Sequence, residues 1–269
     1  MEIIIYIFVF IFGLIIGSFL NVVICRYNTG KTFGGRSMCF SCGKILKWYE
    51  LVPVLSFLFL RGKCSVCKSK ISWQYSIVEI VTGLLFLGAF FLSPFNIYLL
   101  VYLCAQFALL MVLAVYDIRH KIIPNAFVYV FAILALARIL SSLFLGNYDS
   151  SVLLWNILAG PICFLPFAGV WYFSRGKWIG FGDAKLALGM GWFLGLSNAY
   201  IAIVLAVWTG AIVGVGLILY TKILCFATNK KITMKSEIPF GPFLVFGLLM
   251  VLFFEPWIIN FIKFFFTFQ

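Results

Sequence analysis

The chain alternates long apolar segments with short polar breaks, and one long polar stretch interrupts this pattern. An apolar segment at 3–24 precedes the polar stretch at 25–75, which we call the insert. Seven further apolar segments cover residues 76–93, 97–116, 122–145, 152–173, 184–197, 199–224 and 240–262. Because about 20 apolar helical residues cross a bilayer, the pattern predicts an all-α polytopic membrane protein of about eight transmembrane helices with a small cytoplasmic insert between helices 1 and 2.

We divide the chain into a first transmembrane helix at 1–24, the insert at 25–75 and a domain of about seven transmembrane helices at 76–269. One of these segments is short. The 15 residues from Asp183 to Ser197 span about 22 Å as a helix, less than the ~30 Å hydrocarbon core. Either the preceding residues 180–182 dip into the membrane, or this helix lies where the bilayer is thinned.

Composition agrees with this class and excludes an ordinary soluble protein. Hydrophobic residues make up 64% of the chain and charged residues 10%, and the mean hydropathy is +1.14. Basic residues outnumber acidic ones by 20 to 8. If the insert is cytoplasmic, the predicted topology places 18 of the 20 basic residues on the cytoplasmic side, as the positive-inside rule expects. Topology therefore explains the basic excess, and we expect no nucleic-acid partner.

The insert carries two CxxC pairs. Cys39 and Cys42 form the first pair, and Cys64 and Cys67 follow after 21 intervening residues. This spacing is close to that of four-thiolate zinc sites, and a cytoplasmic insert disfavours disulfides. Zinc is the favoured interpretation; iron, a disulfide or no metal are the alternatives. Four thiolates leave no open coordination position, so the metal would fold the insert rather than catalyse.

Acidic residues are scarce, and two of the three aspartates occupy corresponding places. Asp117 ends the third apolar segment and Asp183 begins the sixth, so the predicted topology puts both at the cytoplasmic side. Two such carboxylates are what an aspartyl protease requires, one accepting a proton from water and the other donating one to the scissile carbonyl. The alternative is structural: Asp183 caps a helix, and Asp117 pairs with Arg119 or Lys121.

Several motifs occur in one order along the chain. They are 17–26, the two cysteine pairs, 50–56, 73–79, Asp117 with 123–125, 180–186 and 239–243. This combination resembles the type IV prepilin peptidases, a family of GxGD membrane aspartyl proteases, and the resemblance covers most of the chain.

The resemblance implies an enzyme of the bacterial cytoplasmic (inner) membrane that removes the leader peptide of type IV prepilins or pseudopilins. It also implies N-methylation of the new amino terminus with S-adenosylmethionine. Asp117 and Asp183 match the catalytic aspartates, and the four cysteines match the zinc ligands. Candidate cofactor-binding residues are Asn21, Arg26, Glu50 and Glu79. Candidate substrate-positioning residues are Gly180, Gly182, Lys185, Pro239, Gly241 and Pro242.

Two alternatives remain at this point. The first is a peptidase without methyltransferase activity, in which the zinc insert is structural. The second is a non-enzymatic transporter or assembly factor that uses the aspartates to bind protons or cations. The expected partners are the pilin substrate and membrane lipid, and the sequence makes no prediction of oligomeric state.

Overall fold

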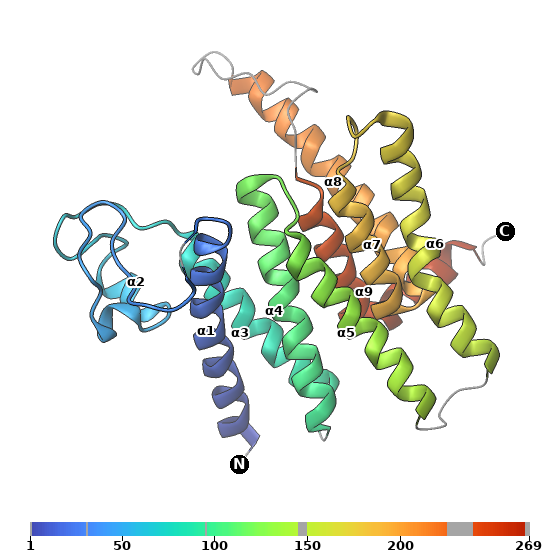
Figure 1. Cartoon of the computed structure of the whole chain (residues 1–269), viewed down its shortest axis with the longest axis horizontal. Coiled ribbons are helices and arrows are strands. Elements are labelled where there is room, and N and C mark those ends of the chain that lie inside the picture. The colour runs from blue at the N-terminus through green and yellow to red at the C-terminus, as the bar shows by residue number, and fades with distance from the viewer. Residues whose placement is uncertain (1, 31, 95, 145–149, 225–238, 267–269) are drawn as a thin grey trace. The chain divides into compact units, whose positions relative to one another are not determined.

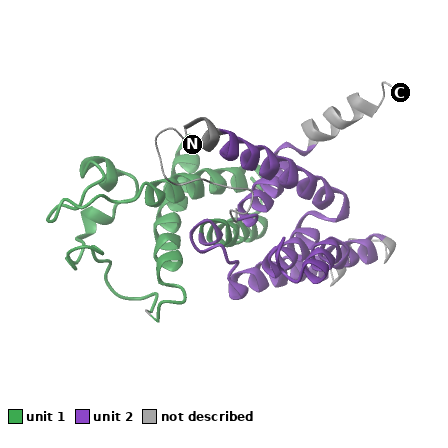
Figure 2. Ribbon diagram, turned by 90° about the horizontal axis from the view of Figure 1, so that it is seen from above, with its two compact units in different colours: residues 1–115 green, residues 116–269 purple. Residues whose placement is uncertain are grey.

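The computed structural model describes residues 2–30, 32–94, 96–144, 150–224 and 239–266 (Figure 1). The chain divides into two compact units, Met1–Val115 and Tyr116–Gln269, which Figure 2 colours separately. The division falls inside the helix α4 (Ile97–His120), close to its carboxyl end. Each unit is described by itself.

The first unit pairs two long helices and carries the insert between them. α1 (Glu2–Arg26) packs along α3 (Gln74–Leu92). A Cβ at Gly13 would lie 2.7 Å from the Gly83 Cα, and one at Gly17 would lie 2.8 Å from the Glu79 Cα. Small residues four apart let two helix backbones approach closely within a membrane. The two glycines of α1 therefore set the close approach of this pair.

Within the insert, regular structure is limited to short elements. η1 (Trp48–Leu51) and α2 (Leu55–Phe59) are short helices. Two isolated antiparallel bridges, Met38 with Ile45 and Lys63 with Lys70, close the loops that hold the two CxxC pairs. The insert therefore depends on local turns and side-chain contacts rather than on a large apolar core.

The second unit is a helical bundle built around a short central helix. It contains the end of α4, α5 (Asn125–Phe144), α6 (Ser150–Ser174), α7 (Phe181–Leu194), α8 (Leu196–Leu224) and α9 (Gly241–Phe266). α7 contacts α5, α6, α8 and α9. Its glycines permit this, because a Cβ at Gly189 would lie 2.5 Å from the Phe131 ring and one at Gly191 would lie 2.4 Å from the Ala159 carbonyl oxygen. The helix that carries Asp183 is thus the core of the bundle.

The predicted all-α membrane class is confirmed for the described residues. Six helices are long and apolar enough to cross a membrane, namely α1, α3, α4, α5, α6 and α8. α7 has 14 residues, and α9 contains a shorter apolar stretch, Gly241–Glu255. The predicted break at 197–198 is misplaced: α7 ends at Leu194 because Gly195 has a φ of 78°, which favours glycine. The predicted loop near 222–237 lies largely outside the described residues.

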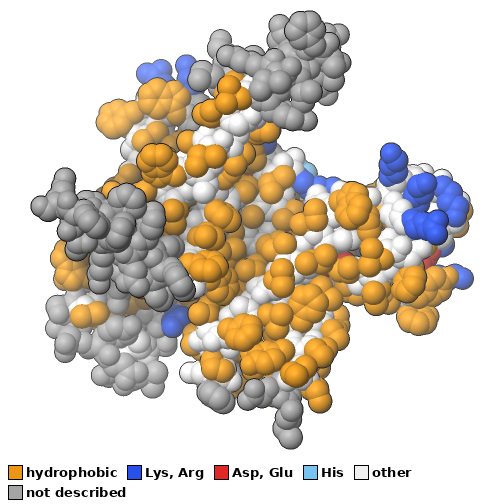
Figure 3. Space-filling view, turned by 180° about the vertical axis from the view of Figure 1, so that it is seen from behind, with side chains coloured by type: hydrophobic (Ala, Val, Ile, Leu, Met, Phe, Trp, Pro, Cys, Tyr) orange, Lys and Arg blue, Asp and Glu red, His pale blue; other side chains and the backbone are white. Residues whose placement is uncertain are grey.

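Large apolar side chains are exposed along the long helices, as a lipid-facing surface requires. Ile4 and Phe8 of α1 are each 70% exposed, and Trp208 of α8 is 65% exposed. Figure 3 shows hydrophobic side chains over the helices, while Lys and Arg gather at the insert. The chain is therefore an integral membrane protein.

Candidate active site and metal-binding insert

Asp117 is buried near the carboxyl end of α4, with only 4% of its surface exposed. Its Oδ2 atom accepts a hydrogen bond of 2.9 Å from the backbone N–H of Gly241, the first residue of α9. A Cβ at Gly241 would lie 2.7 Å from that oxygen, so glycine makes this approach possible. The carboxylate thus lies at a helix amino terminus, where the backbone dipole favours negative charge.

Asp183 is also buried and lies in the first turn of α7, with 7% of its surface exposed. Gly180 precedes the helix in an extended conformation, and a Cβ there would lie 3.4 Å from Asp183 Oδ2. The carboxylate thus turns back toward the residue that precedes its own helix. The helix-capping role of Asp183 stays a prediction.

The two carboxylates belong to one site. The Asp117 charge exerts an unfavourable Coulombic interaction on Asp183. Between their supporting glycines lies Ile123: a Cβ at Gly182 would be 2.8 Å from the Ile123 Cβ, and one at Gly241 would be 3.3 Å from its Cδ1. Ile123 thus spaces the amino termini of α7 and α9. Contacts through Gly241, Ile123 and Gly182 therefore place the two carboxylates in one site.

Lys185 is held beside this site rather than in it. Its Nζ donates a hydrogen bond of 2.8 Å to Asn125 Oδ1 at the start of α5. The same ammonium lies 4.9 Å from the ring centroid of Phe181 and 5.1 Å from that of Tyr129. These contacts fix a positive charge two residues from Asp183. The remaining predicted positioning residues, Pro239 and Pro242, flank the amino terminus of α9.

The four insert cysteines come together. Their Sγ atoms all lie within 4.8 Å of one another, and the Sγ atoms of Cys39 and Cys67 are 3.8 Å apart. Tetrahedral zinc with bonds of about 2.3 Å places its sulfurs roughly 3.8 Å apart. The donor set therefore fits a closed four-thiolate metal site.

The two cysteine loops share one backbone pattern. The N–H groups of Cys39 and Cys64 donate to the carbonyls of Lys44 and Ser69, each at 2.9 Å. The fourth residue after each of these cysteines is left-handed, Gly43 with a φ of 70° and Lys68 with a φ of 58°. Each CxxC pair thus sits on a tight turn that directs two sulfurs to one point.

Hydrogen bonds prepare two of these thiols for ionisation. The backbone N–H groups of Cys42 and Ser41 lower the pKa of Cys39 to about 6. The Ser69 side chain lowers the pKa of Cys67. Cys42 differs: the Lys44 backbone lowers its pKa, but desolvation and the neighbouring sulfurs outweigh this effect and raise the pKa to about 11. A metal cation bound between the four sulfurs would offset the repulsion among their thiolates.

Glu50 ties the two cysteine loops together. Its carboxylate accepts hydrogen bonds from the Lys44 ammonium at 2.7 Å, the Ser65 hydroxyl at 2.5 Å and the Lys47 backbone N–H at 2.9 Å. Its side chain is 1% exposed. The Lys44 hydrogen bond is the largest cause that lowers the pKa of Glu50 to about 2. Glu50 is thus an internal brace of the insert.

The other predicted cofactor-binding residues also make internal contacts. Arg26 donates to four backbone carbonyls between Thr32 and Arg36. Glu79 Oε2 accepts the Val54 N–H at 2.8 Å, which joins the insert to α3. Asn21 donates to the Tyr75 carbonyl at 3.0 Å, and its buried Oδ1 has no hydrogen-bond partner among the described residues. Of the four, Asn21 is the one with an unused acceptor.

Two residues of the site had no predicted role. Ile123 and Asn125 belong to the quoted 123–125 motif, but a lone Ile and Asn carry no chemistry that a sequence pattern assigns. Their roles follow from contacts with Gly182, Gly241 and Lys185, which are distant in sequence.

Together these features define a polytopic membrane protein with a buried pair of carboxylates at helix amino termini and a four-cysteine insert. Residues 11–93 match the family model of the bacterial peptidase A24 N-terminal domain, and residues 104–215 match that of the type IV leader peptidase family. The chain therefore belongs to the type IV leader peptidase family and is an enzyme. This membership decides against a non-enzymatic transporter or assembly factor.

Relatives named prepilin leader peptidase/N-methyltransferase match along most of the chain. The protein from Bacillus subtilis is 34% identical over 257 residues, covering 94% of this chain and 95% of the relative. The one from Legionella pneumophila is 30% identical, covering 95% and 93%. The one from Myxococcus xanthus is 36% identical, covering 80% of this chain and 64% of the relative. No solved structure matches the chain.

Proposed function

We propose that Asp117 and Asp183 are the catalytic pair of an aspartyl endopeptidase that removes the leader peptide of type IV prepilins or pseudopilins. The observation that carries this proposal is the meeting of two buried carboxylates from α4 and α7 at one site. The names of the relatives supply the substrate class.

The arrangement fixes one oxygen of Asp117, because the Gly241 N–H donates to it. The Asp183 carboxylate lies against Gly180 at the start of α7, so both carboxylates are placed before substrate arrives. With one proton shared, the ionised carboxylate takes a proton from water as that water attacks the scissile carbonyl. The protonated carboxylate donates to the carbonyl oxygen, which gives a tetrahedral diol. The diol then collapses as its C–N bond breaks: the carboxyl that took the water proton gives it to the leaving amine, and a diol hydroxyl returns its proton to the other carboxylate. Gly180 and Gly182 leave room for a substrate backbone, and Lys185 positions it beside the pair.

The insert would hold zinc through Cys39, Cys42, Cys64 and Cys67, and the metal would stabilise its fold without an open position for catalysis. The names of the relatives include N-methyltransferase, and we infer that the enzyme also methylates the new amino terminus, with S-adenosylmethionine as the methyl donor. Asn21, with its unused buried acceptor, is the residue we favour for contact with that donor. We place the enzyme in the bacterial cytoplasmic membrane, with insert and active site on the cytoplasmic face.

The test is substitution of each aspartate by asparagine in the full-length protein. Asp117→Asn and Asp183→Asn each keep the side-chain shape and remove the ionisable group, so prepilin cleavage should fall at least about 10³-fold. Cleavage of a purified prepilin by the enzyme in lipid is followed by mass spectrometry. Wild-type cleavage in either variant would rule out the pair.

Glu255→Gln is the matched control. Glu255 accepts a hydrogen bond of 2.9 Å from Asn198, and we assign it no part in the reaction, so cleavage should persist. Labelled S-adenosylmethionine and a pre-cut pilin separate the second activity. Methyl transfer by Asp183→Asn would show that cleavage and methylation use different residues. No methyl transfer by the wild type would favour a peptidase without methyltransferase activity.

A further inference from the structure

A proline inside α6 leaves one carbonyl of that helix without its usual donor. In an α-helix the carbonyl of residue 157 accepts a hydrogen bond from the N–H of residue 161. Residue 161 is proline, which has no N–H and whose ring crowds the carbonyl four residues earlier. The Ile157 carbonyl therefore needs a donor from elsewhere, as carbonyls freed by proline in transmembrane helices generally do.

Trp192 of α7 supplies that donor. Its indole Nε1–H donates a hydrogen bond of 2.9 Å to the Ile157 carbonyl oxygen. The indole reaches this oxygen because α6 has a glycine at the crossing: a Cβ at Gly160 would lie 2.5 Å from Trp192 Cε2. The two backbones also meet here, since a Cβ at Gly191 would lie 2.8 Å from the Gly160 Cα. We call the contact of Ile157, Gly160 and Pro161 with Trp192 the α6–α7 lock.

The lock gives α7 a directional contact that most of its surface lacks. The buried residues of α7 are largely alanine and glycine. Such small side chains make smooth contacts, and between apolar helices in a membrane no hydrophobic force holds them in one place. Lys185 bonds to Asn125 near the amino end of α7, and Trp192 bonds to Ile157 near the carboxyl end. The helix is therefore held near both of its ends.

Trp192 lies far from the reacting atoms. It follows Asp183 by nine residues, which is about 14 Å along the axis of α7 and half a turn around it. The indole is thus on the face of the helix away from the carboxylate. Asp183 moves with the helix, however, so a shift or rotation at the lock is carried through the 14 residues of α7 to the carboxylate. Small misplacements of a catalytic group slow a reaction strongly.

We propose that Trp192 is a positioning residue of the peptidase site. By donating to the carbonyl that Pro161 leaves free, it sets the depth and rotation of α7 and thereby the place of Asp183. This inference rests on the proposed function of the aspartate pair. It also gives Pro161 a role, because any other residue there would have an N–H that competes with the indole for the Ile157 oxygen.

The test is a double-mutant cycle with full-length enzyme in lipid and a purified prepilin. Trp192→Phe keeps an aromatic ring and removes the N–H, so kcat should fall about tenfold. KM should change less than about twofold, because Trp192 lies away from the aspartate pair. Pro161→Ala returns an N–H to Ile157 and should itself lower kcat several-fold.

The comparison between backgrounds decides the result. In the Pro161→Ala background, Trp192→Phe should lower kcat less than about twofold further, because the carbonyl no longer depends on the indole. In the control background Pro166→Ala, which removes the other proline of α6, it should still cost about tenfold. Equal losses in all three backgrounds would mean that only the volume of the indole matters, and would overturn the proposal.

Glycine variants of α6 approach the lock from the other side and leave Trp192 in place. Gly160→Ala should displace the indole and lower kcat as Trp192→Phe does. Gly169→Ala is its control, since a Cβ at Gly169 would meet nothing within 4 Å, and kcat should not change. Wild-type kcat in Gly160→Ala would contradict the positioning role.

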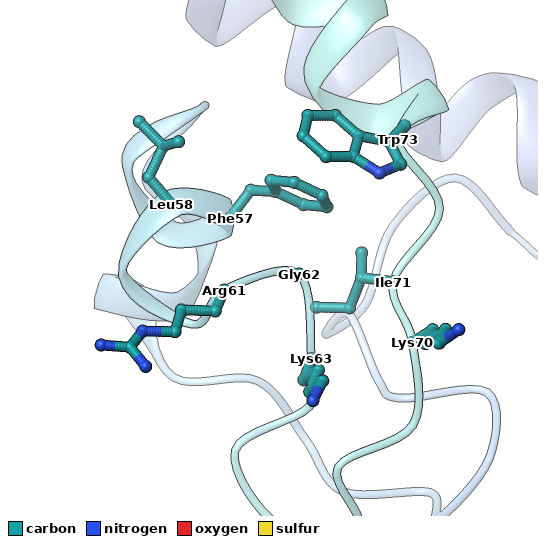
Figure 4. Close-up of a pocket in the computed structure, with 8 residues that line it drawn as sticks. All are labelled: Phe57, Leu58, Arg61, Gly62, Lys63, Lys70, Ile71 and Trp73. Atoms are coloured by element: carbon teal, nitrogen blue, oxygen red, sulfur yellow. The ribbon is translucent and has the colours of Figure 1, made fainter.

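A spectroscopic measurement follows the hydrogen bond without any activity. The ultraviolet resonance Raman difference between wild type and Trp192→Phe should show a hydrogen-bonded indole N–H, and a weaker one in the Pro161→Ala background. Trp73→Phe is the control. Trp73 belongs to the insert and faces Phe57 across a hollow (Figure 4), so its loss should leave the Trp192 signature and kcat unchanged.

The two proposals fail in different ways. A wild type that shows the indole signature but does not cleave prepilin would overturn the proposed function and the positioning role together. An active wild type in which the Trp192 indole is free would overturn the positioning role alone.

Discussion

The two units each gather ionisable side chains, but they do so in opposite ways. The insert brings together four thiols from two local turns, and two of them, Cys42 and Cys67, are exposed. The bundle brings together two carboxylates from separate helices, and both are buried. A closed set of thiolates suits a metal that folds the chain. A buried pair in which Asp117 is fixed by one backbone N–H leaves carboxylate oxygens available for a reaction.

The largest effect that this comparison predicts is loss of the metal. Cys64→Ser removes the one buried ligand of the four, so zinc affinity should fall at least about 10³-fold, and the insert should lose its fold because metal binding supplies folding free energy. Bound zinc per chain and amide hydrogen exchange over residues 38–45 and 63–70 measure this. Removal of the metal by a chelator should give the same exchange pattern.

Cys104→Ala is the matched control, since Cys104 lies in α4 outside the insert. It should retain zinc and normal exchange. If the units are independent in function, the Cys64→Ser enzyme should still cleave prepilin in lipid. Retention of zinc by Cys64→Ser would contradict a four-thiolate site.

The same contrast explains what the sequence could predict. The cysteine spacing was enough to predict the four-sulfur cluster, because each pair lies on one local turn. Gly43 is also suited to the left-handed position of its turn. The places of the two aspartates at the ends of apolar segments also predicted that they come together, and both are buried in the second unit. Their supports were not predicted: Gly241 lies 124 residues from Asp117, and Asn125 lies 60 residues from Lys185. Such contacts depend on helix packing, which periodicity does not specify.

No helix packing was predicted from the glycines, although part of the packing follows from them. Gly13 and Gly17 follow a small-residue spacing that favours close helix pairing, and this is where α1 meets α3. The central position of α7 in the bundle was harder to predict from the sequence. Its 14 residues suggested a short span, whereas its glycines at 189 and 191 are what let α5 and α6 close around it.

A substitution at Gly241 tests the support of the aspartate pair, and its effect should be the second largest. In Gly241→Ala the new Cβ would lie 2.7 Å from Asp117 Oδ2. The carboxylate must rotate away and lose the Gly241 N–H, while the backbone keeps its conformation. We expect kcat/KM for prepilin cleavage to fall about 10²-fold, as small misplacements of a catalytic group do.

Gly34→Ala is the control for this experiment. A Cβ at Gly34 would meet nothing within 4 Å, so cleavage should match the wild type. Unchanged thermal unfolding of Gly241→Ala would separate a misplaced carboxylate from a damaged fold. Full activity in Gly241→Ala would mean that the α9 amino terminus does not orient Asp117.

The smallest of these effects concerns Glu50, which is an acid with a structural role in the unit that lacks the aspartate pair. Glu50→Gln removes the charge that Lys44, Ser65 and Lys47 contact, and should destabilise the insert by about 2 kcal/mol. Because Lys44 and its neighbours lower the pKa of Glu50 from 4.5 to about 2, the wild-type advantage is fully present above pH 4.5. This advantage is lost as the pH falls toward 2, because Glu50 is then protonated in the folded as well as in the unfolded protein. The measurement compares hydrogen-exchange protection over residues 44–50 between the wild type and Glu50→Gln at each pH. The ratio of the two protection factors should be constant above about pH 5 and should fall toward 1 below it. A ratio that stayed constant down to pH 2 would show that the brace depends on side-chain shape rather than on charge.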